Sequence, residues 1–290
     1  MRVLNVTNWS FGRNRRLHDE MREVILAHDL TLHYLDGDAD HNRTVSAFSG
    51  EWEPLSAALM ELVHVVLPHV DLTRHTGVHP RIGALDVCPF VPLEDDAWDE
   101  LRPLVEAFGE NLSAQTGVPV YLYEKSERGR HEADLPSLRK GGFGSLIGKE
   151  LSPDFGPRAA HPQWGVAVVG MRAFLLAMNV NLKEADPTLA KNLARQARRL
   201  RSEGDPRFLG VRALGFPLAS VGLSQVSFNL TLPDLTAIDD LVDWVREQAA
   251  LAGVAVAGTE LIGVIRGRDV LTSSQVPIAP GQVVETPAGI

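Results

Sequence analysis

Cysteine, surplus basic charge and long apolar runs are all scarce in this sequence. The 290 residues contain one cysteine, Cys88, which excludes an intramolecular disulfide framework and a multi-cysteine zinc site and favours a reducing compartment. Lys and Arg number 28 against 37 Asp and Glu, and the resulting net charge of -9 argues against nucleic acid as the main partner. No apolar run approaches the roughly 18 residues of a membrane span, and the first ten residues lack the apolar core of a signal peptide. We therefore expect a cytoplasmic protein that binds neither membrane nor nucleic acid.

The composition is that of a globular protein large enough for two folding units. Hydrophobic residues make up 44% of the chain and charged residues 22%, which is enough apolar material for a sizeable core. The length suits two units of roughly 100–150 residues each.

Strand and helix periodicities follow the same order in both halves of the chain. In the first half, a strand, a helix, two strands, a helix and a strand are predicted at residues 3–7, 17–25, 30–35, 44–48, 55–66 and 87–91. A further helix and strand follow at 98–112 and 119–123. In the second half, strands are predicted at 173–182, 211–214, 225–230 and 254–257, with helices after residue 186 and around 238–245. This β-α-β-β-α-β order is typical of the ferredoxin-like motif, so we predict an α+β fold with two antiparallel sheets.

The first candidate site is the segment at residues 71–90, which concentrates two histidines between a helix end and a strand. Catalytic side chains often lie on loops of this kind. A neutral imidazole can accept and return a proton near neutral pH, and both His75 and His79 qualify for that role. The alternative is that either histidine only makes a hydrogen bond within a turn.

A metal site is a weaker interpretation of the same two histidines. They are four residues apart, as in zinc-binding helices, but Gly77 and Pro80 disfavour a helix through both. The glutamate that a zinc hydrolase has beside its first histidine is Thr76 here. We therefore predict no metal.

The second candidate is the acidic segment LDGDADHNRTV at residues 35–45. It begins like a calcium-binding EF-hand loop, but position six is His41 rather than glycine and position twelve is Ala47 rather than glutamate. It is either a polar hairpin turn or the source of a carboxylate that orients a catalytic histidine.

The third candidate is the glycine-rich segment at residues 139–165. A phosphate-binding loop is excluded, because Phe143 replaces a required glycine and Glu150 replaces the required Ser or Thr. The segment is either a flexible linker or one wall of a ligand groove, in which Phe155 and Trp164 offer flat surfaces. Positive charge would come from Arg139, Lys140 and Lys149.

Read together, these segments resemble the glutamate formiminotransferase family, whose domain occurs alone or fused to a cyclodeaminase. The strongest stretch is RHTGVHPRIGALDVCPF at residues 74–90, followed by DGDADHNRTV at 36–45 and PDFGPRAAHPQWG at 153–165. In the second half, similar stretches are FLLAMNVNL, QVSFNLT and GTELIGVI, which begin at residues 174, 225 and 258.

The resemblance implies a fold, a reaction and a set of site residues. The family's N-terminal and C-terminal subdomains fall on residues 1–170 and 171–290, both ferredoxin-like, with a folate groove between them. The implied reaction moves a formimino group from N-formimino-L-glutamate to tetrahydrofolate, which is the co-substrate. The family also implies a homodimer, and we expect no cyclodeaminase domain in this chain.

The catalytic histidine of the family falls on His79 and its assisting aspartate on Asp38, which we predict to hold the tautomer of the imidazole. The folate segment comprises Gly156, Pro157, Arg158, Ala159, Ala160, His161, Pro162, Gln163, Trp164 and Gly165. Substrate contacts are predicted at Asn8, Arg43, Arg74 and Arg81.

One stretch departs from the family pattern. Where the family has Pro-Asn-Phe-Ser-Glu-Gly, residues 7–12 read Thr-Asn-Trp-Ser-Phe-Gly, so Phe11 replaces an acidic residue. Two alternatives therefore remain open: formyl transfer from N-formylglutamate to tetrahydrofolate, or a catalytically silent folate-binding paralogue.

Overall fold

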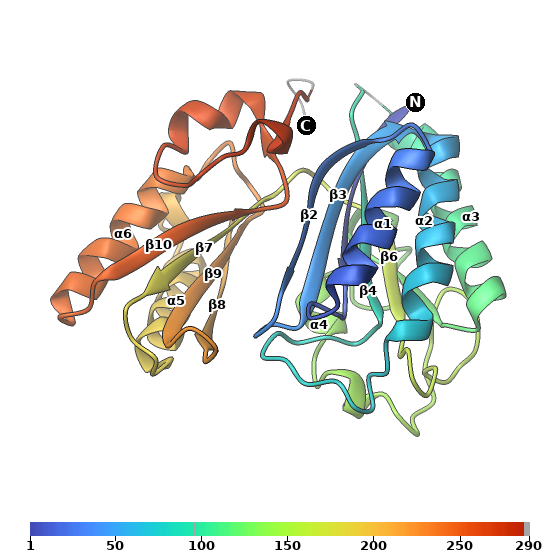
Figure 1. Ribbon diagram of the computed structural model, residues 1–290, viewed down its shortest axis with the longest axis horizontal. Coiled ribbons are helices and arrows are strands. Elements are labelled where there is room, and N and C mark those ends of the chain that lie inside the picture. Colours follow the sequence, from blue (N-terminus) through green and yellow to red (C-terminus); the bar gives the residue numbers. More distant parts are fainter. Residues whose placement is uncertain (95–96, 287–290) are drawn as a thin grey trace. The chain divides into compact units, whose positions relative to one another are not determined.

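The computed structural model describes residues 1–94 and 97–286 (Figure 1). The chain divides into two compact units, Met1–Arg172 and Ala173–Thr286, each with its own sheet. Within the described ranges, no helix combines the length and the apolar character needed to cross a membrane.

The first unit begins with the β-α-β-β-α-β order that periodicity predicts. Its elements are β1 (Arg2–Trp9), α1 (Arg15–Ala27), β2 (Thr31–Asp38), β3 (Arg43–Glu51), α2 (Trp52–Val66) and β4 (Leu85–Pro92). They are followed by α3 (Trp98–Thr116), β5 (Val120–Leu122), α4 (Leu135–Leu138) and β6 (Ala167–Met171). The strands form one sheet in the order β2-β3-β1-β4-β6-β5.

Two strand pairings in this sheet differ from the antiparallel prediction. Strand β6, at residues where periodicity predicts no strand, pairs parallel with both β4 and β5. Parallel neighbours need a long crossover connection. The connection from β4 to β6 contains α3, and the one from β5 to β6 consists of residues 123–166. The remaining pairs of this sheet are antiparallel, so the predicted α+β class is confirmed, with a sheet that is mostly rather than wholly antiparallel.

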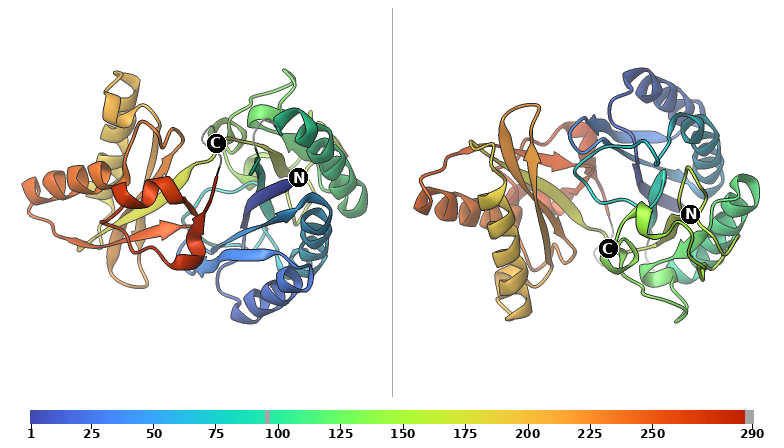
Figure 2. Two further views of the ribbon diagram at one scale, coloured as in Figure 1. Left: turned by 90° about the horizontal axis from the view of Figure 1, so that it is seen from above. Right: turned by 90° about the horizontal axis from the view of Figure 1, so that it is seen from below.

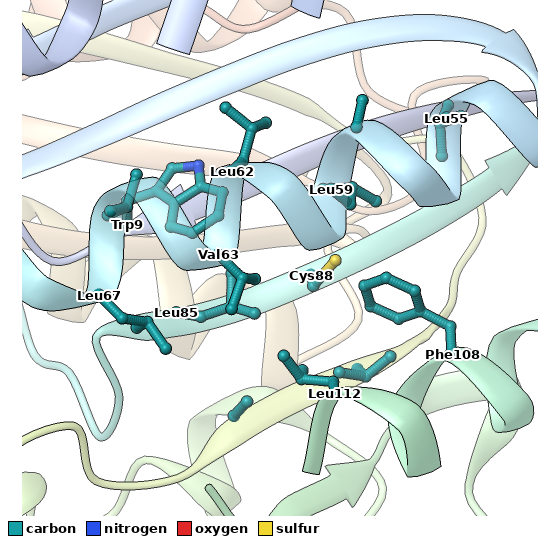
Figure 3. Close-up of a cluster of buried hydrophobic side chains, with 14 of the residues drawn as sticks. Trp9, Leu55, Leu59, Leu62, Val63, Leu67, Leu85, Cys88, Phe108 and Leu112 are labelled. Atoms are coloured by element: carbon teal, nitrogen blue, oxygen red, sulfur yellow. The ribbon is translucent and has the colours of Figure 1, made fainter. Parts of the chain in front are cut away.

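Helices α1, α2 and α3 cover one face of this sheet (Figures 1 and 2). Side chains alternate across a strand, so Val3 and Trp9 of β1 both enter the core beneath the helices. Figure 3 shows Val63 of α2 with Leu85 and Cys88 of β4 in the buried core of this unit. Burial raises the pKa of the Cys88 thiol to about 11, which agrees with a core role for this residue.

The loops that carry the site lie at one end of this sheet. Strand β1 ends where β3 and β4 begin, because Trp9 is paired with both Thr44 and Leu85. The turn between β2 and β3 and the loop that leads into β4 therefore meet at this end.

The second unit repeats the order with a simpler sheet. It contains β7 (Leu176–Leu182), α5 (Thr188–Ser202), β8 (Val211–Leu218), β9 (Leu223–Leu230), α6 (Ile238–Leu251) and β10 (Val256–Ile262). The strand order is β10-β7-β9-β8, with every pair antiparallel. A short parallel pair, β11 (Ile265–Arg266) with β12 (Val283–Val284), follows.

Candidate active site

His79 is buried at the end of the first sheet, with 9% of its surface exposed. Its Nδ1 lies 2.8 Å from the carbonyl oxygen of Pro80, and its Nε2 lies 2.8 Å from Nη1 of Arg43. A carbonyl only accepts and a guanidinium only donates, so Nδ1 carries the proton and Nε2 accepts from Arg43. The geometry thus defines a neutral imidazole in a single tautomer.

The surroundings of His79 favour that neutral form. Burial is the main reason that its pKa is well below the usual 6.5, and the positive charges of Arg43 and Arg139 lower it further. The His41 ring lies alongside, with its centroid 5.7 Å from that of His79. At neutral pH the imidazole is therefore a base with a lone pair on Nε2.

Asp38 is not a hydrogen-bond partner of either ring nitrogen in the contacts described for His79. The group that holds the tautomer of His79 is the Pro80 carbonyl, whereas we had assigned that role to Asp38. Asp38 is exposed and accepts the backbone N–H of His41 at 2.7 Å. It is the backbone partner of Arg43 in the pairing of β2 with β3. Its charge acts on Arg43, whose pKa it raises against the larger lowering effect of burial.

Arg81 fastens the histidine loop to the β2–β3 turn. Its Nη2 donates to the carbonyls of His41 and His79, both at 2.7 Å, and its Nη1 donates to the Asn42 carbonyl at 3.0 Å. Burial lowers its pKa to about 10, so it stays charged at neutral pH. A substrate bound at Arg81 would therefore have to share the N–H groups that already donate to these backbone carbonyls.

His75 takes part in the same hydrogen-bond network as Arg81. Its Nε2 lies 3.0 Å from the Asn42 carbonyl, and its Nδ1 lies 2.8 Å from Nη1 of Arg81. Burial and the charge of Arg81 lower its pKa to about 4. These contacts agree with the alternative that His75 serves only as a hydrogen-bonding partner in a turn.

Asp86 and Arg139 form a buried ion pair next to the histidine loop. Asp86, which is 1% exposed, accepts the backbone N–H groups of Ile82 at 2.9 Å and Gly83 at 3.3 Å. Its other oxygen accepts from Nη2 of Arg139 at 2.5 Å. Because this carboxylate is already engaged, the region around His79 carries a local surplus of positive charge.

The glycine-rich segment is tied to the histidine loop by backbone hydrogen bonds. Leu72 donates to the carbonyl of Gln163 and Ala84 to that of Trp164, both at 2.9 Å. Gly165 has φ +69°, and a Cβ there would lie 2.0 Å from the Ile82 carbonyl oxygen, so only glycine fits. The structure thus brings residues 156–165 and His79 into one region of the first unit.

Within that segment, two aromatic rings stack on each other. The ring centroids of His161 and Trp164 are 4.3 Å apart and the planes differ by 8°. Nδ1 of His161 accepts the backbone N–H of Trp164 at 3.0 Å. Residues 156–159, 162 and 163 are exposed, so much of the segment is accessible.

Models of the formiminotransferase domain match both units of the chain. The N-terminal subdomain matches residues 2–172, and the formiminotransferase domain matches residues 177–283. The chain belongs to the formiminotransferase family. The resemblance of its motifs to that family is thereby confirmed.

Relatives in this family include fused and shorter proteins. The formimidoyltransferase-cyclodeaminase of Sus scrofa is 36% identical over 268 residues, which cover 90% of this chain and 49% of the relative. The glutamate formimidoyltransferase of Streptococcus pyogenes serotype M1 is 33% identical, with 89% of this chain and 87% of the relative covered. That of Thermoplasma acidophilum is 32% identical, with 90% and 86% covered. The chain thus spans about half the length of the fused relative and most of the shorter ones.

The remaining predicted contact residues of this family member are more scattered. Asn8 is half-buried on β1, between Val45 of β3 and Val87 of β4. Arg74 is exposed on the loop before β4. Phe11, which replaces the family's acidic residue, is 6% exposed and packs its ring 5.3 Å from that of His18. The substitution is therefore accommodated by apolar packing.

Pro80 and Asp86 contribute to the site although the sequence did not single them out, and Arg139 has a role beyond the groove charge predicted for it. Pro80 acts through its backbone carbonyl, which leaves no signal in residue type. Arg139 was expected to supply positive charge, but Asp86 lies 53 residues away and nothing local marks the two as partners. In the part of the chain that the structure describes, no group of three or more His, Cys, Asp or Glu residues is placed to hold a metal ion.

His75 should make the first unit sensitive to acid. The folded-state pKa of about 4 lies below the usual 6.5, so the unfolded chain takes up a proton first as the pH falls. Stability from this group is full above pH 6.5 and is lost progressively down to about pH 4. Between pH 7 and pH 5 we expect the urea midpoint to fall less in His75→Gln than in the wild type. Equal falls in both proteins would contradict the assignment, because the contribution of His79 is common to the two.

Proposed function

We propose that this protein is a glutamate formimidoyltransferase, which moves a formimino group from N-formimino-L-glutamate to tetrahydrofolate and releases glutamate. The observation that carries the proposal is the neutral His79, whose only proton-accepting nitrogen lies in a region of surplus positive charge. The shorter relatives named glutamate formimidoyltransferase support the choice of reaction, since most of their length is covered.

The proposed mechanism uses one imidazole for two proton transfers. The secondary amine at position five of tetrahydrofolate attacks the formimino carbon and gives its proton to Nε2 of His79. The bond between that carbon and the glutamate nitrogen then breaks, and the imidazolium returns the proton to the leaving nitrogen. Pro80 keeps Nδ1 protonated throughout, so the ring is neutral again at the end of the cycle. Holding both partners in line contributes the larger share of the rate.

The proposed site residues follow from this mechanism. His79 is the catalytic base and acid, and Asp38 assists through the charge of Arg43 rather than by touching the imidazole. Residues 156–165 bind the folate, with His161 and Trp164 as a stacked aromatic surface. Asn8, Arg43, Arg74 and Arg81 are proposed to contact the substrates, whose glutamate carboxylates call for positive charge.

We further propose that residues 1–170 and 171–290 are the N-terminal and C-terminal subdomains, both ferredoxin-like. The strand orders β2-β3-β1-β4 and β10-β7-β9-β8 support this, as does the gap between the two matched regions. Residues 287–290 of the second subdomain lie outside the described residues. A homodimer and a cytoplasmic location are part of the same proposal; the buried thiol of Cys88 suits a reducing compartment.

A steady-state assay with two donors tests the function. Purified protein is incubated with tetrahydrofolate and either N-formimino-L-glutamate or N-formyl-L-glutamate, and the folate product is followed by absorbance. We expect turnover with the formimino donor. Turnover with the formyl donor alone would overturn the proposed donor, and folate binding without turnover of either would indicate a silent paralogue.

A further inference from the structure

The lone pair that the proposed chemistry needs is already in use in this structure. Nδ1 of His79 carries a proton that it donates to Pro80, so Nε2 is the only ring atom able to accept another. That nitrogen accepts a hydrogen bond from Nη1 of Arg43 at 2.8 Å. While the bond persists, the amine of an incoming substrate cannot transfer its proton to His79.

Arg43 has unused capacity for a different partner. Among the described residues, its guanidinium hydrogen-bonds only to His79, which leaves most of its five N–H groups available. The other two guanidinium groups nearby differ from it: Arg81 donates to three backbone carbonyls, and the charge of Arg139 is already paired with that of Asp86. Arg43 is thus the cation of the cluster best able to receive an anion.

The charges around Arg43 favour the binding of an anion. Burial lowers the pKa of Arg43 to about 10, and repulsion from the positive charges of Arg139 and Arg81 adds to this effect. Asp38 on β2 and Asp86 on β4 oppose this effect, but Asp38 is exposed and Asp86 is engaged by Arg139 and two backbone N–H groups. A further negative charge would relieve the repulsion.

We propose that Arg43 is a carboxylate-operated latch on His79: a substrate carboxylate draws the guanidinium to itself and so releases Nε2 to accept a proton. A carboxylate can accept two parallel N–H groups of an arginine, and this charged pair is stronger than a bond to a neutral imidazole. The inference rests on the proposed function only for the identity of the substrate. The latch itself is a property of these side chains.

The latch gives the donor two tasks. Its carboxylate releases Nε2 of His79 from the hydrogen bond with Arg43. The positive charge of Arg43 is then paired with the carboxylate and no longer suppresses protonation of the imidazole. The pKa of His79 therefore rises when the anion binds, which helps the ring to hold the proton between the two transfers. The other groups near the ring are His41 from the β2–β3 turn, Arg81 and Pro80 from its own loop, and Arg139 after α4. Arg43 is in these terms a positioning residue, because it acts through His79.

Histidine titration by NMR tests the latch without any turnover. Full-length protein is labelled with ¹⁵N in its histidine rings, and His79 is assigned by comparison with His79→Asn. The pKa of His79 is then measured alone, with L-glutamate, and with the uncharged glutaramide. In the wild type we expect a low pKa that rises by about one pH unit with L-glutamate and does not move with glutaramide.

Variants at Arg43 separate the latch from a general effect of the ligand. In Arg43→Met, the pKa of His79 should already be raised in the free protein and should no longer respond to L-glutamate. In Arg43→Lys, which keeps the charge, the free pKa should stay low. Arg195→Gln, at an exposed position on α5, should behave as the wild type.

Two results would overturn the latch: an unchanged free pKa of His79 in folded Arg43→Met, or an equal response to L-glutamate in that variant and the wild type. Circular dichroism establishes that each variant is folded, and Arg43→Lys provides the comparison if Arg43→Met does not fold. Failure of the donor assay with an intact titration response would reject the proposed function alone.

Discussion

Replacing His79 with asparagine should lower kcat for formimino transfer by about 10²–10⁴-fold, the usual contribution of a general acid and base. An asparagine side chain has an amide N–H at the position of Nδ1, so it can still donate to the Pro80 carbonyl, while no atom replaces Nε2 as the acceptor for Arg43. It cannot, however, accept and return a proton near neutral pH. We therefore expect a folded protein with little activity.

The measurements that accompany this variant are kcat, tetrahydrofolate affinity and the thermal midpoint. Affinity and midpoint should stay near the wild-type values, because the loss is confined to proton transfer. His64→Asn is the matched control, since His64 is an exposed histidine of α2 that bonds to Gln115. Wild-type kcat in His79→Asn would remove His79 from the mechanism.

Replacing Asp86 with alanine should reduce the free energy of unfolding of the first unit by about 3–5 kcal/mol. The carboxylate is 1% exposed and is shared by Arg139 and the backbone N–H groups of Ile82 and Gly83. Its removal leaves a largely buried guanidinium without its counter-charge and two N–H groups without an acceptor. The loop that carries His79 should loosen as well, because Ile82 and Gly83 end it.

Urea unfolding followed by tryptophan fluorescence measures this effect, since four of the five tryptophans belong to the first unit. Arg139→Met removes the other partner, and the double variant should be more stable than the sum of the two single losses predicts. Glu20→Ala is the control, because Glu20 pairs with Arg16 on the surface and should change stability by only about 0.5 kcal/mol. Strict additivity of the two single changes would show that the pair is not coupled.

The buried ion pair and the latch share a physical basis. Arg43, Arg81 and Arg139 lie around His79, and the buried carboxylate of Asp86 is bound to Arg139 and to backbone N–H groups. Such an arrangement keeps His79 neutral without a ligand. Under the proposed function, an anionic substrate supplies the missing counter-charge, and this accounts for the arginines gathered here in a protein with a net charge of -9.

Helices and antiparallel strands could be predicted because their signal is local. The apolar side chains of α2 recur at helical spacing and enter the core together, so residues 55–66 were assigned before any contact was known. Strand β6 escaped because residues 167–171 are buried on both faces and show no alternation. Its parallel partners, β4 and β5, are distant in sequence and leave no local mark.

Residue types in the sequence indicated where the site lies but not which role each residue has in it. His79 and its loop could be singled out from composition and from the family motif. Arg81 and Arg43 have the same chemistry, yet one binds backbone carbonyls and the other binds the imidazole. The tautomer of His79 was assigned to Asp38, because a carboxylate is visible in a sequence and the Pro80 carbonyl that holds the proton is not.

The amino-acid sequence by itself determined the family, the order of elements and the loop that holds His79. These depend on periodicity and motif, which neighbouring residues encode. Only the tertiary structure decided which arginine faces the lone pair, which carboxylate is buried and which nitrogen carries the proton. Those properties depend on distances and dielectric surroundings between segments tens of residues apart, and such distances exist only once the chain has folded.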